Sequence, residues 1–201
     1  MKQILIIHGG TCFETKEGYL GLLKKKSVDL DKFRVGNNWK ENMAYELKGS
    51  YDVLMPKMPC KERAEYEDWS IWFQRIVDHC RSPLILVGHS LGGIFIAKYL
   101  SENSIKTTIE KAVLIAAPFD KTGLKESLGD FTPTSSLKNF EEQAGKIYLL
   151  HSKDDPVVPF EHLKKYQEKL PKAETLIFED RKHFNQERFP ELIDLFKKDP
   201  A

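Results

Sequence analysis

Residues 84–93 read LILVGHSLGG, in which an apolar run is followed by a glycine-rich turn and then by a second apolar segment. The run at 84–87 is short and continuously apolar, which is typical of a strand buried on both faces. The segment that begins near Gly93 has the composition of a helix. A serine in the turn between them has the strand-turn-helix setting of a nucleophile elbow. We therefore predict that Ser90 is a nucleophile.

The glycines on either side of Ser90 support this interpretation. Gly88 and Gly92 stand two positions before and after the serine, where the chain folds back so tightly that a small residue is needed. The helix that follows presents its N-terminus to the serine, and the helix dipole there favours developing negative charge. The G-x-S-x-G pattern also arises by chance, but its place between a strand and a helix makes the prediction specific.

Short apolar segments alternate with segments of helical periodicity along the whole chain. We predict strands at 4–7, 52–55, 83–87, 112–116, 147–150 and 175–178. Helices are predicted at 69–80, 94–100, 160–170 and 187–197, where apolar residues recur every three or four positions. This alternation favours a three-layer α/β architecture with a doubly wound, mostly parallel sheet. The sequence shows no repeat and no linker, so we expect one domain over residues 1–201.

The composition is that of a globular protein without a strong charge. The 201 residues are 41% hydrophobic, and 31 basic against 30 acidic residues give a net charge of +1. This balance gives no electrostatic reason to expect nucleic acid or a membrane as a partner. No apolar run is long enough for a signal peptide or a membrane span, so a cytoplasmic location is expected. Cys12, Cys60 and Cys80 are odd in number and widely spaced, which predicts reduced thiols.

A serine hydroxyl becomes an effective nucleophile only when a base accepts its proton. His183 follows the last predicted strand after a short turn and precedes the last helix. This position agrees with the chain order serine, acid, histidine of hydrolases that have a nucleophile elbow. We predict packing and loop hydrogen bonds for the three other histidines at strand ends and no role for the two in helices. These five are His8, His89 and His151, and His79 and His162.

The base in turn needs a carboxylate that fixes its tautomer and stabilises the imidazolium. Residues 149–159 read LLHSKDDPVVP, in which a strand ends and two acids precede a turn rich in proline. We place the acid at Asp155, because Pro156 restricts it to extended backbone angles and so fixes its direction. Asp154 is the close alternative. Asp120, directly after the fourth strand, is a more distant one.

Two backbone N–H groups are needed to bind the oxyanion of the tetrahedral intermediate. One comes from the residue after the nucleophile, which is Leu91. The second is expected from the loop after the first strand, whose glycines allow the backbone to approach a substrate closely. We predict Gly10 as this donor, with Thr11 as the alternative.

Two long connections interrupt the regular alternation. Residues 11–50 lie between the first and second predicted strands, and residues 119–140 lie between the fourth and fifth. Long connections at the carboxyl ends of strands are often functional. Because the chain has no room for a large cap domain, we expect both connections to border a small acyl pocket.

Taken together, the motifs resemble those of the α/β-hydrolase superfamily. The resemblance rests on the glycine loop at 8–10, the elbow at 88–92, Asp155 in the register D-x-x-V-P, and His183. The small size makes the chain similar to the compact serine hydrolases of the retinoblastoma-binding hydrolase family and their bacterial relatives. These also share a phenylalanine after the histidine, here Phe184. The resemblance implies an α/β-hydrolase fold without a large cap domain.

Two local features depart from the pattern of that family. Lys182 stands where its members usually have glycine before the histidine, which bears on the geometry of the loop rather than on the role of His183. The family is named for binding retinoblastoma protein through Leu-x-Cys-x-Glu. Residues 58–62, MPCKE, match this motif only in part, because they begin with Met and contain Pro. We interpret the partial match as coincidence.

The leading hypothesis is a serine hydrolase that cleaves a carboxylic ester, while thioesters and amides are open to the same groups. Ser90 attacks, His183 transfers the proton and Asp155 orients His183, while Leu91 and Gly10 bind the oxyanion. The expected partner is a small-molecule ester. No cofactor or metal is expected, because no residues have metal-ligand spacing. The alternative is a non-catalytic binding or scaffold protein with the same fold. The complete set of catalytic residue types argues against it.

Overall fold

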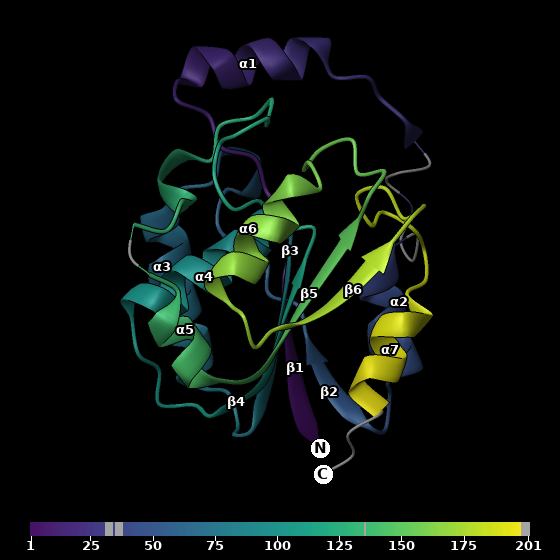
Figure 1. The fold of residues 1–201 in the computed structure, drawn as a ribbon. Coiled ribbons are helices and arrows are strands. Elements are labelled where there is room, and N and C mark those ends of the chain that lie inside the picture. The colour runs from purple at the N-terminus through teal and green to yellow at the C-terminus, as the bar shows by residue number, and fades with distance from the viewer. Residues whose placement is uncertain (31–33, 35–37, 135, 198–201) are drawn as a thin grey trace.

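The computed structural model describes residues 1–30, 34, 38–134 and 136–197. In this part of the chain, six strands form one sheet in the order β2-β1-β3-β4-β5-β6, and all neighbouring strands are parallel. The strands are β1 (Lys2–Ile7), β2 (Tyr51–Leu54), β3 (Leu84–His89), β4 (Ile109–Ile115), β5 (Ala144–Ser152) and β6 (Glu174–Phe178). All carboxyl ends therefore meet at one edge of the sheet (Figure 1).

Helices cover both faces of this sheet (Figure 1). They are α1 (Lys16–Lys25), α2 (Trp39–Glu46), α3 (Tyr66–Val77), α4 (Leu91–Glu102), α5 (Lys138–Gln143), α6 (Glu161–Lys169) and α7 (Pro190–Lys197). Two separate apolar clusters show which helix packs where. Side chains of α3, α4, α5 and α6 cover one face, and those of α2 and α7 cover the other. The predicted three-layer α/β architecture is confirmed.

The central strands are apolar on both sides because both of their faces are covered. All six residues of β3 are buried, as are the last five of β1. Successive side chains of a strand point to opposite faces. Accordingly, Leu5 and Ile7 join the cluster under α3 and α4, whereas Ile4 and Ile6 join the one under α2 and α7. Burial on both faces requires continuous apolar runs in these strands. Such runs are the pattern from which the strands were predicted.

Strands β4 and β5 begin earlier than predicted. β4 starts at Ile109 and includes Lys111, which is buried and whose Nζ donates to the carbonyl oxygen of Leu195 at 3.4 Å. β5 starts at Ala144, and a Cβ on Gly145 would lie 2.6 Å from the carbonyl oxygen of Glu110 in β4. The sequence did not predict these strand starts, because charged residues and a glycine occupy them. The contacts that bury these residues come from segments distant in the sequence.

Two helix predictions also need correction. α7 begins at Pro190 rather than at residue 187, in agreement with the preference of proline for the first position of a helix. In α3, Trp69 and Phe73 are fully buried, but Trp72 is 41% exposed. The core face of α3 is therefore narrower than its run of apolar residues suggests.

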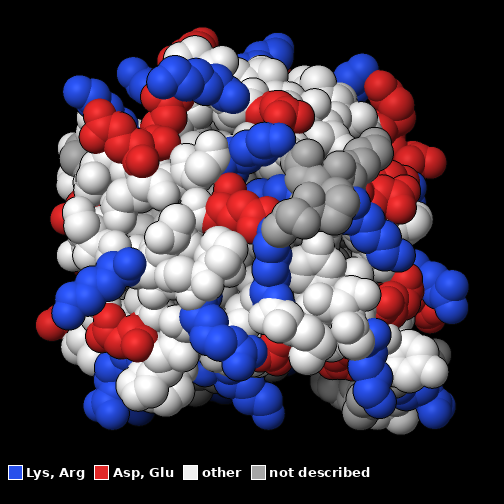
Figure 2. Space-filling model, turned by 90° about the horizontal axis from the view of Figure 1, so that it is seen from below, with Lys and Arg blue, Asp and Glu red and all other residues white. Residues whose placement is uncertain are grey.

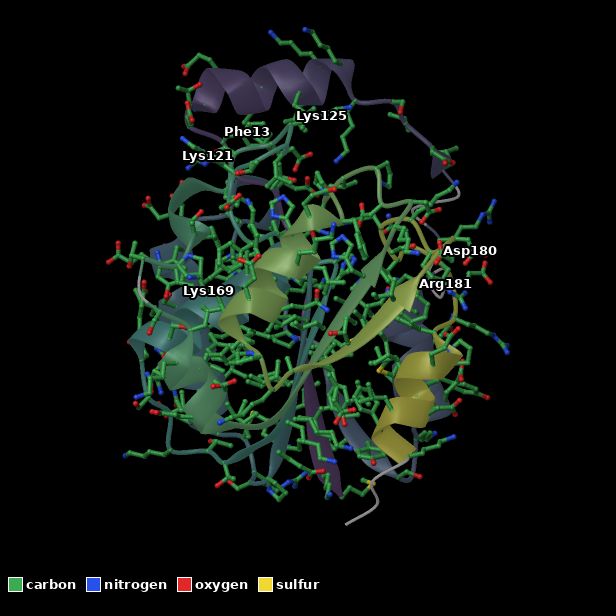
Figure 3. All side chains as sticks on the ribbon, in the orientation of Figure 1. Phe13, Lys121, Lys125, Lys169, Asp180 and Arg181 are labelled. Carbon is green, nitrogen blue, oxygen red and sulfur yellow. The ribbon has the colours of Figure 1, made fainter. Side chains whose placement is uncertain are left out.

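The first long connection, residues 11–50, contains two helices that were not predicted. α2 packs Trp39 and Met43 into the core. α1 has no buried residue and lies across the end of the molecule where the strands have their carboxyl ends (Figure 1). Phe13 and Lys125 lie on the side of α1 that faces the rest of the molecule (Figure 3). The segments 31–33 and 35–37 of this connection lie outside the described residues.

The surface carries charges of both signs. On the face shown in Figure 2, basic and acidic side chains are interspersed, which agrees with the near-neutral net charge. Within the described ranges, no helix is long and apolar enough to cross a membrane. The cysteines are free thiols: Cys12 is buried, Cys60 is exposed and Cys80 is intermediate.

Candidate active site

Ser90 lies in the sharp turn between β3 and α4, at the carboxyl edge of the sheet. Its φ of 56° and ψ of −123° are rarely adopted by a residue other than glycine. Two backbone hydrogen bonds hold the turn: the Ser90 N–H donates to the carbonyl oxygen of Ile115 at 2.8 Å, and the Gly93 N–H donates to that of Ser90 at 2.8 Å. The turn exposes Ser90 to two cavities at this edge.

Close backbone contacts explain the two glycines that flank Ser90. A Cβ on Gly92 would lie 2.3 Å from the carbonyl oxygen of Ile7, at the end of β1. A Cβ on Gly88 would lie 2.5 Å from the carbonyl oxygen of Gly92. Both obstacles are backbone atoms of the sheet and of α4, which cannot rotate away as a side chain can. The G-x-S-x-G spacing is therefore a steric requirement of this turn.

Ser90, His183 and Asp155 come from the ends of three strands, β3, β6 and β5, and form a continuous chain of hydrogen bonds. Nε2 of His183 lies 3.0 Å from Oγ of Ser90. Nδ1 of the same ring lies 2.9 Å from Oδ2 and 3.1 Å from Oδ1 of Asp155. When Nδ1 donates its proton to the carboxylate, Nε2 carries the lone pair that can accept the serine proton. The structure thus brings together the three residues predicted for catalysis.

The turn after β5 fixes the direction of the Asp155 carboxylate. Its Oδ1 accepts the N–H groups of Val157 at 2.8 Å and Val158 at 3.0 Å. The side chain is fully buried, whereas that of His183 is 10% exposed. A buried histidine, His151, lies behind it with Nε2 3.9 Å from Oδ2 of Asp155 and donates to the carbonyl oxygen of Val158. These contacts leave Oδ2 directed at His183.

The two alternative acids have other partners. Oδ1 of Asp154 accepts the N–H of Lys182 at 2.8 Å and the hydroxyl of Ser152 at 2.6 Å. Asp154 therefore ties the end of β5 to the loop after β6. Asp120 forms an ion pair with Lys165 at 2.6 Å. The geometry joins Asp155, and neither of these two, to the imidazole.

Two buried side chains hold the His183 loop: His89, for which a loop hydrogen bond was predicted, and Trp39, which the sequence did not indicate. Nε2 of His89 donates to the carbonyl oxygen of His183 at 2.9 Å, and Nε1 of Trp39 donates to that of Phe184 at 2.8 Å. Both rings are buried and meet edge to face, with centroids 6.0 Å apart. Burial lowers the pKa of His89 well below its usual value, which keeps the ring neutral. The two bonds span 94 and 145 residues of sequence, so the partner of neither side chain is indicated by a local pattern.

The residues on both sides of His183 have left-handed backbone conformations. The φ angle is 49° at Lys182 and 52° at Phe184. This region costs an L-residue roughly 1–2 kcal/mol, which explains the glycine found at the first position in the resembled family. Here Lys182 adopts the conformation with its N–H bonded to Asp154. The departure from glycine therefore leaves the loop geometry intact.

The predicted oxyanion donors border Ser90. Gly10 and Leu91 line the same cavity as Ser90. Leu91 is the first residue of α4, and N–H groups of a first turn have no partner within the helix. The alternative donor Thr11 is engaged, because its N–H donates to the carbonyl oxygen of Lys61 at 2.8 Å. Among the residues that the structure describes, the Gly10 N–H has no acceptor, which leaves it free for a ligand.

Two cavities meet at Ser90 and Gly10 and differ in character. The smaller, of about 130 Å³, is lined mainly by apolar groups of Pro118 and of residues 124–128 and 156–158. The larger, of about 310 Å³, is open to solvent and is lined by polar groups that include Lys61 and His183. Residues 11–50 were also expected to border the acyl pocket. For the described residues this is wrong, since none of them lines the smaller cavity and only Thr11 reaches the larger one.

The other reactive side chain near the site is Cys12. It is buried, and burial raises the pKa of its thiol to about 12. The thiolate is the nucleophilic form of cysteine, so this residue stays inert at neutral pH. In the part of the chain that the structure describes, no three His, Cys, Asp or Glu side chains are grouped as metal ligands.

Comparisons with known proteins agree with this site. A family model described as serine hydrolase matches residues 34–196. The serine hydrolase RBBP9 of Rattus norvegicus is 27% identical over 130 residues, which cover 64% of this chain and 68% of that protein. The ydeN gene product of B. subtilis has a TM-score of 0.78 at 20% identity, over 98% of both chains. A structure from work on carboxylesterases of Nitrososphaera gargenis has a TM-score of 0.61 at 14% identity, over 98% of this chain and 89% of that one. The similar structures confirm the α/β-hydrolase fold.

Proposed function

The chain belongs to the serine hydrolase family, and we propose that it cleaves carboxylic esters of small molecules through an acyl-enzyme formed on Ser90. The observation that carries this proposal is the hydrogen-bonded chain from Ser90 through His183 to Asp155, at the junction of two cavities. The similarity to a carboxylesterase structure supports esters as the substrate class. Thioesters and amides have a carbonyl carbon that the same groups attack.

In the first half-reaction, Oγ of Ser90 attacks the ester carbonyl carbon while Nε2 of His183, 3.0 Å away, accepts the hydroxyl proton. The carboxylate of Asp155, 2.9 Å from Nδ1, stabilises the imidazolium that forms. The N–H groups of Leu91 and Gly10 bind the oxyanion. His183 then gives its proton to the leaving oxygen, the carbon–oxygen bond breaks, and the acyl group remains on Ser90.

In the second half-reaction, water repeats the attack from the leaving-group side. His183 accepts a proton from the water as it adds to the acyl carbonyl. The second tetrahedral intermediate collapses when His183 returns the proton to Oγ of Ser90. The carboxylic acid leaves and the serine is restored. The proton balance closes without a metal or an external base.

The smaller cavity supports a short acyl group. Its lining includes Leu124, Leu128 and Val158, so it suits an apolar chain. Its volume of about 130 Å³ is well below the roughly 300–1,000 Å³ of typical small-molecule pockets. We therefore expect acetyl and butyryl esters to react faster than octanoyl esters.

A fluorophosphonate probe tests the proposal directly. The wild-type protein is expected to be labelled on Ser90, and Ser90→Ala is expected to lose both labelling and ester hydrolysis. Hydrolysis is expected to continue after exhaustive treatment with a chelator. Labelling that survives in Ser90→Ala, or that maps to Cys12, would contradict Ser90 as the nucleophile, and a wild type that is neither labelled nor active would favour the non-catalytic scaffold. Cytoplasmic location, one-domain organisation and the lack of a nucleic-acid or membrane partner stay predictions from the sequence.

A further inference from the structure

The N–H of Gly10, the proposed second oxyanion donor, belongs to the peptide group that joins two glycines. A trans peptide group is planar, so the carbonyl oxygen of Gly9 and the N–H of Gly10 point in opposite directions. Whatever holds the Gly9 carbonyl in place therefore also sets the direction of the Gly10 N–H.

Close contacts require glycine at both positions and leave this peptide group without side chains of its own. A Cβ on Gly9 would lie 3.2 Å from Cβ of Ser90. A Cβ on Gly10 would lie 2.7 Å from the carbonyl oxygen of Lys61. Glycine has the widest choice of backbone conformations, so this peptide group needs an outside contact to keep one orientation.

The imidazole of His8 supplies such a contact. Its Nδ1 lies 2.6 Å from the carbonyl oxygen of Gly9, and its Nε2 lies 2.9 Å from the backbone N of Met58. A backbone N–H can only donate, so Nε2 must carry a lone pair and the proton of the neutral ring is on Nδ1. Nδ1 therefore donates to the Gly9 carbonyl. Burial lowers the pKa of His8, which favours the neutral ring.

The segment that holds the imidazole is itself firmly placed. Met58 is buried, and the next residue, Pro59, accepts a hydrogen bond at its carbonyl oxygen from Nε1 of Trp69 at 2.8 Å. The ring of Trp69 meets the imidazole edge to face, with centroids 5.7 Å apart. Further along, the carbonyl oxygen of Lys61 accepts the N–H of Thr11 at 2.8 Å. The loop after β1 is thus attached to this segment on both sides of the Gly9–Gly10 peptide.

We propose that His8 is a positioning residue that directs the N–H of Gly10 at the oxyanion. Given the proposed function, it acts by holding the Gly9 carbonyl, while Met58 holds its ring. His8 lines neither of the two cavities at Ser90, so it acts through the backbone and not on the substrate. A hydrogen bond to the carbonyl also polarises the peptide group and makes its N–H a stronger donor.

Two amide variants separate the bond to Gly9 from the bond to Met58. In His8→Asn the amide nitrogen takes the place of Nδ1 and can still donate to the Gly9 carbonyl. In His8→Gln the amide lies one carbon further out, near the place of Nε2. There it can accept the Met58 N–H but leaves the Gly9 carbonyl without its donor. Both variants keep a polar side chain with one hydrogen bond to the backbone.

The readout is the preference for an oxygen ester over a sulfur analogue. Phenyl butyrate is compared with its thiono analogue, in which C=S replaces C=O, because sulfur is the weaker acceptor for oxyanion donors. The ratio of the two kcat/KM values does not depend on how much of a variant is folded. His8→Gln is expected to lower this ratio about tenfold, less than the roughly 10²–10³ lost in kcat when an oxyanion donor is removed outright. His8→Asn is expected to stay near the wild-type ratio.

The matched control is His162→Leu. His162 is also a buried imidazole that joins two backbone groups: Nδ1 accepts the N–H of Phe119 and Nε2 donates to the carbonyl oxygen of Thr122, both at 2.9 Å. It makes these bonds outside the oxyanion loop, so the wild-type ratio is expected. Equal ratios in His8→Gln and His162→Leu would overturn the proposal. So would a His8→Asn variant whose ratio falls as far as that of His8→Gln.

An inhibitor that needs no turnover separates this inference from the proposed function. In butyl trifluoromethyl ketone the carbonyl carbon forms a reversible bond to Oγ of Ser90, the hydroxyl proton passes to His183, and the carbonyl oxygen becomes an oxyanion. Its affinity is expected to fall about tenfold in His8→Gln and to be retained in His8→Asn.

The two measurements together decide both questions. If the wild type cleaves neither ester but the ketone shows this pattern, the proposed function fails and the positioning role of His8 stands. If the wild type cleaves phenyl butyrate and His8→Gln changes neither the ratio nor the affinity, the positioning role fails and the function stands. A wild type that neither cleaves the esters nor binds the ketone contradicts both.

Discussion

Nε2 of His89 donates a hydrogen bond to the carbonyl oxygen of His183, so the residue that precedes Ser90 holds the backbone of the proposed base at 2.9 Å. The two imidazole rings lie 5.0 Å apart. His89 is the last residue of β3 and His183 lies in the loop after β6, and these two strands are not neighbours in the sheet. The hydrogen bond therefore links two distant strand ends directly and fixes the distance between Oγ of Ser90 and Nε2 of His183.

Removing this donor is expected to lower the rate without weakening substrate binding. In His89→Leu the carbonyl oxygen of His183 loses its buried partner, at a cost of about 1–3 kcal/mol. Because the loop carries the base, we expect kcat for ester hydrolysis to fall about tenfold or more while KM changes little. Steady-state kinetics on a butyryl ester measure both constants.

His89→Gln serves as the rescue variant, because its amide nitrogen can donate along a similar path. It is expected to recover most of the lost kcat. A His89→Leu protein that is folded and has the wild-type kcat would show that Trp39 and the other loop contacts position His183 without help.

A stability prediction concerns the strained residue beside the base. Lys182 has a φ of 49° and is exposed, and its backbone N–H bond to Asp154 does not need the side chain. Lys182→Gly removes a steric cost of roughly 1–2 kcal/mol and adds about 0.5–1 kcal/mol of chain entropy. The free energy of unfolding in urea is expected to rise by about 0.5–1 kcal/mol. Lys182→Ala retains the Cβ, so a similar gain in that control would contradict the argument.

The residues at strand ends were predictable because each has a local signal. Ser90 stands between glycines that the backbone of Ile7 and Gly92 requires. Asp155 and His183 follow short apolar runs and precede turns, so their neighbours along the chain identify them. The sheet was predictable for the same reason, since burial on both faces needs continuous apolar segments.

The supporting residues were not predictable, because their partners are remote in sequence. Trp39 meets Phe184, 145 positions away, and nothing around Trp39 indicates this contact. Lys111 was predicted to lie outside the fourth strand. In the structure it is a buried residue of β4, and its Nζ donates a hydrogen bond to the carbonyl oxygen of Leu195 in α7.

The acyl cavity gives a prediction about chain length. Leu124 lines this cavity, so Leu124→Ala enlarges it. Each methylene in an apolar pocket is worth about 1–3 kcal/mol, so the ratio of octanoyl to butyryl kcat/KM is expected to rise about tenfold. Leu23→Ala, on the exposed surface of α1, is the control and is expected to leave the ratio unchanged. An unchanged ratio in Leu124→Ala would place the acyl chain elsewhere.

The last prediction separates the adjacent acids Asp154 and Asp155. Oδ2 of Asp155 lies 2.9 Å from Nδ1 of His183, whereas Oδ1 of Asp154 accepts the N–H of Lys182. Asp155→Asn leaves the fold intact but removes the charge that stabilises the imidazolium, so kcat is expected to fall by about 10⁴. Asp154→Asn keeps an oxygen that can accept the same backbone bond, so a loss of about tenfold or less is expected. Circular dichroism and substrate binding check that both variants are folded. If Asp154→Asn is the more damaging change, the acid is Asp154, and if neither matters, Asp155 does not stabilise the imidazolium and Asp120 becomes the candidate.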